Sequence, residues 1–106
     1  MRPEASKTVL LDKPMDWQDF QGVDQFELRE PTATETLKAE ENVRNGVNAA
    51  SYRQYSLALI KSVAKLPDGR TMPPAMVNNL PISKVEEAMT YLTSFLGVGQ
   101  ETGETS

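Results

Sequence analysis

The sequence predicts an α+β fold, with a small N-terminal antiparallel β-hairpin packed on a bundle of about three helices and a disordered C-terminal tail. Apolar and polar residues alternate along a segment near the N-terminus, whereas two later segments repeat apolar residues every three or four positions. A chain of 106 residues can bury one modest core but hardly two. We therefore expect one domain over residues 7–97, with a flexible N-terminus at 1–6 and the disordered tail at 98–106.

Two short segments form the expected hairpin. Residues 7–12 are rich in apolar and β-branched side chains, and this strand should stop at Pro14 because proline cannot donate a backbone hydrogen bond. In residues 23–29 the side chains alternate, so that Phe26 and Leu28 share one face and charged residues the other. This alternation indicates a half-buried second strand, antiparallel to the first.

The connection between the strands, residues 15–22, is unusual for a solvated turn because it contains Trp17 and Phe20. We expect it to fold back on the domain. Capping of the small core is the favoured role for both rings, since large aromatic side chains pack more often than they stay free. Docking of a partner is the alternative.

The first helix should begin after Thr32, because Thr32 and Glu35 have the S/T-x-x-E spacing of a capping box. It should run to about Arg44 and end near Asn45 and Gly46, which tolerate a left-handed cap. Few apolar residues line this helix, so we expect it to be peripheral and mostly in water.

The second helix is the expected core helix of the middle of the chain, over residues 49–66. Its apolar stripe advances in steps of three or four residues and consists of Tyr52, Tyr55, Leu59, Val63 and Leu66. A turn at residues 67–70 should follow, and then a loop in which one short helix begins at Pro73 and Pro74.

The last helix has an unbroken apolar stripe and a second capping box, from Ser83 to Glu86. The stripe consists of Val85, Ala88, Met89, Leu92, Phe95 and Leu96. Gly97 should end the helix, and the residues after it are too poor in apolar side chains to offset the entropy lost on ordering.

Composition removes most catalytic and metal-binding classes. The chain contains no cysteine and no histidine, so it lacks the usual zinc ligands, thiol nucleophiles, disulfides and triad bases. Pairs of carboxylates are the remaining raw material for catalysis, and we expect them to be solvated: Glu40 with Glu41, Glu86 with Glu87, and Asp16 with Asp19. We therefore predict no enzyme, no cofactor, and no catalytic or metal-binding residue.

Charge and hydropathy limit the partners. Eleven basic and fifteen acidic residues give a net charge of -4, which disfavours a nucleic-acid partner because phosphate neutralisation needs clustered cations. No apolar run is long enough for a signal peptide or a membrane span. The absence of cysteine favours a reducing compartment, so we expect a cytoplasmic protein that binds another protein.

Three stretches, in order, resemble the tail assembly chaperones of Mu-like contractile-tailed phages and related prophages. They are residues 8–14 (TVLLDKP), residues 26–32 (FELREPT), and residues 80–83 (LPIS), which lead into a helix with Phe95 and Leu96. The resemblance spans about residues 7–96, most of the chain. The Trp17 and Phe20 loop departs from it, because relatives have a shorter polar turn.

The resemblance implies a non-enzymatic protein of the bacterial host cytoplasm. Such a chaperone keeps the tape measure protein soluble and helps tail tube subunits gather on it. It could also form homo-oligomers, and family members often occur in a second, longer form made by ribosomal frameshifting. Neither nucleic acid nor membrane is an expected partner.

Tape measure proteins are typically long, helical and apolar, so we expect an exposed apolar groove that buries their amphipathic stretches. Methionine makes adaptable apolar surfaces, and the candidate partner-binding residues are Met72, Met76, Met89 and Tyr91. Two other interpretations stay open. The methionines could fill gaps in the core instead, and an extended segment could add to the edge of the hairpin.

A small helix-turn-helix DNA-binding regulator is the runner-up, because two helices joined near residues 45–46 could form that motif. An interrupted set of cations would have to supply its basic face: Arg44, Arg53, Lys61 and Lys65. A third alternative is an enzyme with a buried glutamate, which needs a cleft carboxylate with a raised pKa.

Overall fold

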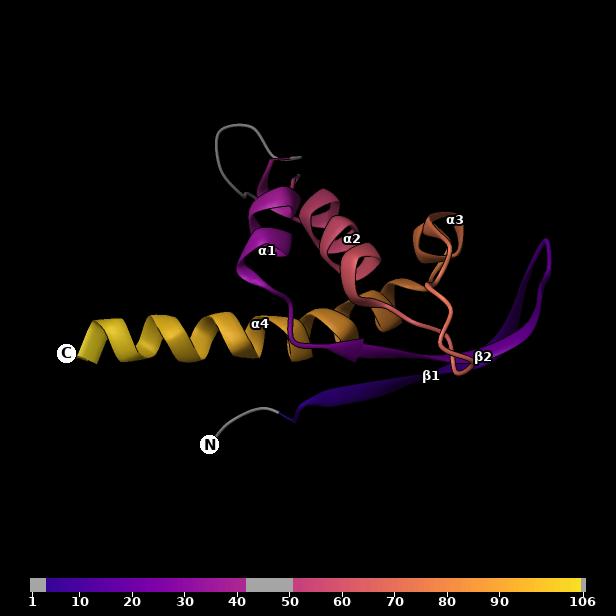
Figure 1. Cartoon of the computed structure of the whole chain (residues 1–106), viewed down its shortest axis with the longest axis horizontal. Helices are drawn as coiled ribbons and strands as arrows, with labels where there is room; N and C mark the ends of the chain where they lie inside the picture. The colour runs from indigo at the N-terminus through magenta and orange to yellow at the C-terminus, as the bar shows by residue number, and fades with distance from the viewer. Residues whose placement is uncertain (1–3, 42–50, 106) are drawn as a thin grey trace.

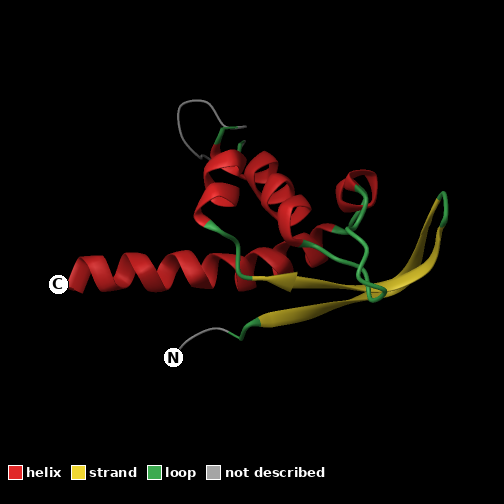
Figure 2. Cartoon of the chain, viewed as in Figure 1, coloured by secondary structure: helices red, strands yellow, loops and turns green. Residues whose placement is uncertain are grey.

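The computed structural model describes residues 4–41 and 51–105, with the backbone alone from residue 96 onward. The described residues form a two-stranded antiparallel hairpin and four helices, which confirms the predicted α+β class. Figures 1 and 2 show the hairpin along one side of the molecule and the shorter helices on the other side. In chain order the elements are β1 (Ser6–Trp17), β2 (Phe20–Arg29), α1 (Ala33–Glu40), α2 (Tyr52–Val63), α3 (Pro74–Asn78) and α4 (Ile82–Thr105).

The two strands pair regularly between residues 6–10 and 25–29. Val9 lies opposite Phe26, and both side chains are buried on the face that meets the helices. Leu10 belongs to the other face and is 61% exposed. The predicted hairpin is therefore confirmed, with its inner face in the core and its outer face in water.

Both strands are longer than predicted, and Pro14 does not end β1. The register shifts between Leu10 and Met15, where β1 has more residues than β2, and Pro14 lies within this bulge. Because the ladder is interrupted there, it does not need the donor that proline lacks. A second shift follows near Gly22, whose φ of 63° suits glycine and whose N–H donates to Asp16 Oδ1 at 2.6 Å.

An additional short β-bridge covers the outer edge of β2, and sequence reasoning missed it. The backbone of Lys65 exchanges two hydrogen bonds with Glu27, of 2.7 and 2.9 Å, and Lys65 also pairs with Thr71. The chain becomes extended directly after α2, because Ala64 has a ψ of 131°. The predicted helix therefore stops at Val63, and the predicted turn at residues 67–70 connects the two sides of this small ribbon.

The predicted capping box of α1 is confirmed. Thr32 Oγ1 accepts from the Glu35 N–H at 3.1 Å, and a Glu35 carboxylate oxygen accepts from the Thr32 N–H at 2.9 Å. Arg29, at the end of β2, donates two further hydrogen bonds to the same carboxylate. The helix ends at Glu40, earlier than predicted, and the predicted stop at residues 44–46 lies outside the described part of the chain.

The core lies between the inner face of the hairpin and the apolar stripes of α2 and α4. Most of each predicted stripe is buried, although Tyr52 and Phe95 are only partly buried. Leu66 lies beyond the end of α2, and the side chain of residue 96 is outside the described part of the chain. The short α3 begins at Pro74 as expected. The largest fully buried side chains include Phe26, Leu28, Leu59, Ile60, Met72, Met76, Met89 and Leu92. One core therefore serves the described chain.

The capping box predicted for α4 is wrong. The helix begins at Ile82, so that Ser83 lies inside the first turn and not at its cap. The N–H groups of Lys84 and Val85 bond instead to the carbonyl oxygen of Pro81, at 2.9 and 3.1 Å. Proline suits this boundary because the residue needs no donor there.

The two predicted loose ends differ from expectation in part. The backbone of α4 stays helical to Thr105, so the predicted end at Gly97 is wrong. Glycine costs a formed helix only about 1 kcal/mol and, unlike proline, removes no hydrogen bond. The disorder predicted for residues 98–106 stays a prediction, because their side chains are not described. Near the N-terminus, β1 already begins at Ser6, and the Glu4 carbonyl accepts a hydrogen bond from α4.

Candidate partner-binding surfaces

The four partner-binding residues predicted from the sequence all lie in the core. The exposed fractions are 0% for Met72, 1% for Met76, 2% for Met89 and 8% for Tyr91. Side chains buried to this degree do not line an exposed groove, so the burial supports the alternative that the methionines fill the core. A role of these four residues in partner binding stays a prediction.

Tyr91 has a structural task of its own. Its ring meets Phe95 edge-on, with the ring centroids 5.1 Å apart, and its hydroxyl donates to the Glu4 carbonyl oxygen at 2.6 Å. Burial raises the pKa of the Tyr91 hydroxyl above its usual value. This hydrogen bond connects the segment just before β1 to α4.

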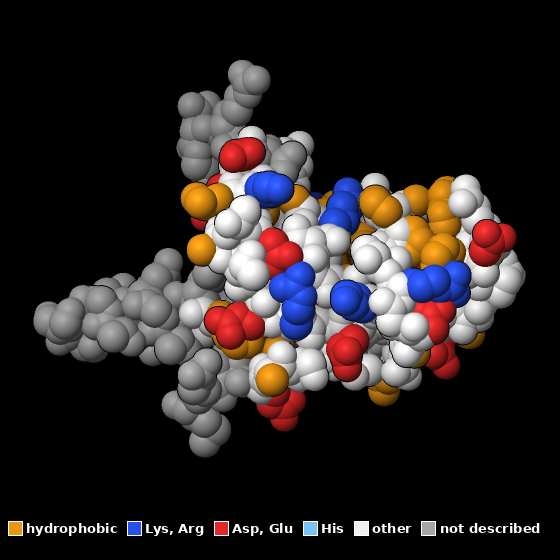
Figure 3. Space-filling model, in the orientation of Figure 1, with side chains coloured by type: hydrophobic (Ala, Val, Ile, Leu, Met, Phe, Trp, Pro, Cys, Tyr) orange, Lys and Arg blue, Asp and Glu red, His pale blue; other side chains and the backbone are white. Residues whose placement is uncertain are grey.

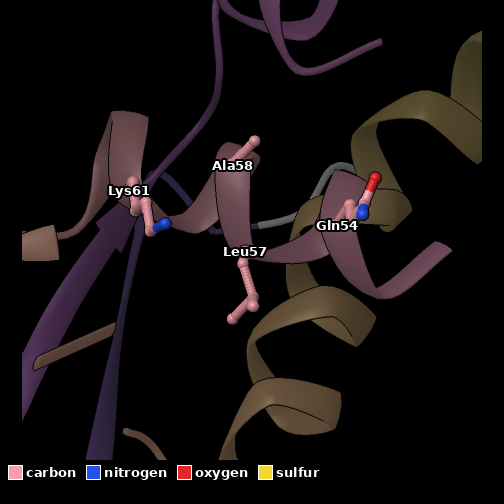
Figure 4. Close-up of a pocket in the computed structure, with 4 residues that line it drawn as sticks. All are labelled: Gln54, Leu57, Ala58 and Lys61. Carbon is pink, nitrogen blue, oxygen red and sulfur yellow. The ribbon is translucent and has the colours of Figure 1, made fainter. Parts of the chain in front are cut away.

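An open hollow of about 490 Å³ lies beside α2 (Figure 4). Gln54, Leu57, Ala58 and Lys61 line it, and their spacing of three and four residues places them on one face of the helix. Leu57 and Ala58 are half-buried and pack against the core from its rim. These four residues, called the Leu57 face of α2 below, have an apolar centre between two polar ends.

A second hollow, of about 340 Å³, lies where the hairpin meets the segment between α3 and α4. It is lined by Asp12, Lys13, Pro14, Met15, Asn79 and Pro81. Met15 is only partly buried, and Ile82 in the adjoining helix is 49% exposed. Figure 3 shows hydrophobic side chains gathered on this end of the molecule, over α3 and the far half of the hairpin. Met15 is thus a methionine that could reach a partner.

The two aromatic residues of the predicted connection, Trp17 and Phe20, differ in burial. Phe20 packs against the core, and the guanidinium of Arg70 lies 4.2 Å from the centre of its ring. Trp17, at the end of β1, is 36% exposed. The predicted capping of the core is confirmed for Phe20, whereas Trp17 remains at the surface.

The carboxylates with displaced pKa values have structural partners. Hydrogen bonds from Arg29 lower the pKa of Glu35 to about 2, against the opposing effect of desolvation. The backbone N–H and the guanidinium of Arg70 hold the pKa of Asp68 below its usual value. An enzyme with a buried glutamate would need a raised pKa, the opposite direction. Among the described residues, no group of acidic side chains could hold a metal ion.

Comparison with protein families decides what kind of protein carries these surfaces. A family model described as "Phage tail assembly chaperone proteins, E, or 41 or 14" matches residues 8–97, most of the chain. The chain belongs to this family of tail assembly chaperones. No curated protein and no solved structure gave a significant match.

Membership confirms the resemblance found in the sequence. As a phage tail assembly chaperone, the protein takes part in tail assembly and has protein partners there. Both hollows lie within the matched residues, as does the whole described core. Within the described part of this chaperone, no helix is long and apolar enough to cross a membrane.

Proposed function

We propose that this chaperone binds the tape measure protein in the host cytoplasm, keeps it soluble and helps tail tube subunits gather on it, without catalysis. Membership of the tail assembly chaperone family, over residues 8–97, is the observation that carries this proposal. The same observation favours it over a DNA-binding regulator, which would in addition need a basic face on a chain of net charge -4.

The Leu57 face of α2 is the surface we propose for the tape measure protein. An amphipathic helix of a partner can lay its apolar side on Leu57 and Ala58, while polar residues at its margins meet Gln54 and Lys61. A contact surface made of so few apolar residues binds weakly, and weak binding suits a chaperone that must release its client during assembly.

Co-expression with the tape measure protein tests the function. We expect the tape measure protein to aggregate alone, and to stay soluble and co-purify when this chain is present. A tape measure protein that aggregates equally in both cases, with no co-purification, would contradict the proposed function.

Matched substitutions test the surface. Ala58→Glu places a charge in the centre of the Leu57 face of α2, and we expect it to abolish co-purification while the chain still folds. Ala75→Glu, at a similarly half-buried position of α3, serves as the control and should co-purify normally. If Met15→Glu abolishes binding and Ala58→Glu does not, the hollow beside the hairpin is the binding surface and the α2 assignment is wrong.

A further inference from the structure

The outer edge of β1 is open, whereas the outer edge of β2 is covered. Lys65 covers β2 through its two backbone hydrogen bonds to Glu27. β1 pairs with β2 alone among the described strands and bridges. In the view of Figure 1 the helices lie on the β2 side of the N-terminal part of β1, so that this part of β1 forms the lower margin of the drawn chain.

The bond to Lys65 fixes which groups of β1 face this margin. Glu27 directs its N–H and C=O away from β1, so Thr8, which lies directly opposite Glu27, belongs to a non-hydrogen-bonded pair. Thr8 must then direct its own N–H and C=O outward. Strand alternation extends this orientation to Ser6 and Leu10, and an edge of this kind is a template for another strand.

We propose that this edge binds the same edge of a second copy of the chain, in an antiparallel pairing centred on Thr8. Thr8 of one copy then lies opposite Thr8 of the other, and Ser6 lies opposite Leu10. Every outward-directed residue of the regular run is paired in this arrangement. It has a two-fold axis perpendicular to the sheet, which keeps the helices of both copies on one face.

The regular run of β1 and its side-chain chemistry favour this register. Within residues 6–10, Lys7 faces Val9 of the second copy, and two threonines or a serine and Leu10 are acceptable neighbours across strands. A pairing centred on Leu10 would instead run into the irregular stretch of β1 between Leu10 and Met15, where the regular strand alternation is broken. The chosen pairing also shields Leu10, an apolar side chain that is 61% exposed in the single chain.

The dimer should be weak. A run this short buries less than the roughly 1,200 Å² of a specific, stable interface. We therefore expect a concentration-dependent dimer, and the proposal does not depend on binding of the tape measure protein.

Single cysteines test the pairing directly, because the natural chain has none. In Thr8→Cys the two Cα atoms would lie about 5.5 Å apart, a spacing that a disulfide can bridge. In Leu10→Cys the two thiols would be displaced by roughly 13 Å along the strands and could not react. Leu37→Cys, an exposed leucine of α1, reports random collisions.

On mild oxidation of the full chain, we expect Thr8→Cys to form a covalent dimer on the order of tenfold faster than both controls. The wild-type chain should also show a rising molar mass with concentration in light scattering. Thr8→Pro should suppress that rise with an unchanged circular dichroism spectrum, because it removes only an outward-directed donor. Cross-linking of Thr8→Cys no faster than that of Leu37→Cys, or faster cross-linking of Leu10→Cys, would overturn the proposed pairing.

Discussion

Arg29 and Glu35 connect the end of β2 to the start of α1. The guanidinium donates to both carboxylate oxygens, at 2.9 and 2.7 Å, and one of those oxygens also completes the capping box with Thr32. Charge-assisted bonds with this fork geometry are stronger than ordinary surface pairs. Local sequence indicated the capping box, but the contribution of Arg29 depends on where the hairpin places β2.

Glu35→Gln should therefore destabilise the protein in a pH-dependent way. The folded-state pKa is lowered from 4.5 to about 2, so the carboxylate stabilises the fold above the unfolded value and loses this effect as the pH falls through about 2. Since Arg29 is 43% exposed, solvent screens the pair and we expect a loss of about 1 kcal/mol at pH 7. Urea unfolding from pH 7 down to pH ~2.5 would measure it.

The difference between wild type and Glu35→Gln should shrink between about pH 5 and pH 2. Glu40→Gln, in the same helix, is the control and should change stability by less than about 0.5 kcal/mol throughout. A Glu35→Gln effect that persists unchanged at low pH would mean that the ionised carboxylate is not its cause.

At the scale of elements, the hairpin turn contains a residue in an unfavourable conformation. Gln18 has a φ of 49°, in the left-handed region, and its carbonyl accepts from the Gln21 side chain at 2.8 Å. Non-glycine residues pay a conformational cost there that glycine does not. Gln18→Gly should raise the free energy of unfolding by roughly 0.5–1 kcal/mol, as measured by denaturant unfolding.

Gln25→Gly is the matched control for this turn. Gln25 lies within regular pairing of β2, where glycine weakens a strand, so this variant should lose roughly 0.5–1 kcal/mol. Equal losses in both variants would show that Gln18 is not strained.

The sequence predicted the elements that rest on local patterns and missed those that rest on distant contacts. The α1 capping box and the stripes of α2 and α4 are local, and all three are present. The bridge from Lys65 to Glu27 joins residues far apart in the chain, and no pattern around Lys65 announces it. Leu66 continues the helical spacing, so the sequence pattern predicts a helix longer than α2.

Two predicted boundaries of elements were wrong for a related reason. Pro14 ends a regular strand only where the ladder needs its donor, and a bulge removes that need. Ser83 has capping-box spacing, yet Pro81 supplies the acceptor for the first turn of α4. In both cases the deciding fact is a backbone position, which side-chain types alone do not fix.

At the scale of the whole molecule, the fold separates a methionine-rich core from its exposed surfaces. Composition suggested methionine as a residue for a binding surface, but burial depends on how α3, α4 and the ribbon after α2 meet, which a single sequence does not show. If two copies pair through β1, their helices lie on one face of a continuous sheet. The Leu57 faces of two copies, on one side of that sheet, would bind a repetitive helical client with higher avidity than a single one.

Methionine substitutions separate a core role from the partner-binding role first predicted for these residues. Met72→Leu, Met76→Leu and Met89→Leu conserve volume, so each should cost less than about 1.5 kcal/mol and leave co-purification with the tape measure protein unchanged. Met76→Ala should lose about 2–5 kcal/mol, because it leaves a cavity at a side chain that is 1% exposed. Unfolding curves and pull-down of the same variants would give both quantities. Loss of binding in a leucine variant of full stability would mean that the core opens to take the client, since a methionine that only fills space has no other way to affect a partner.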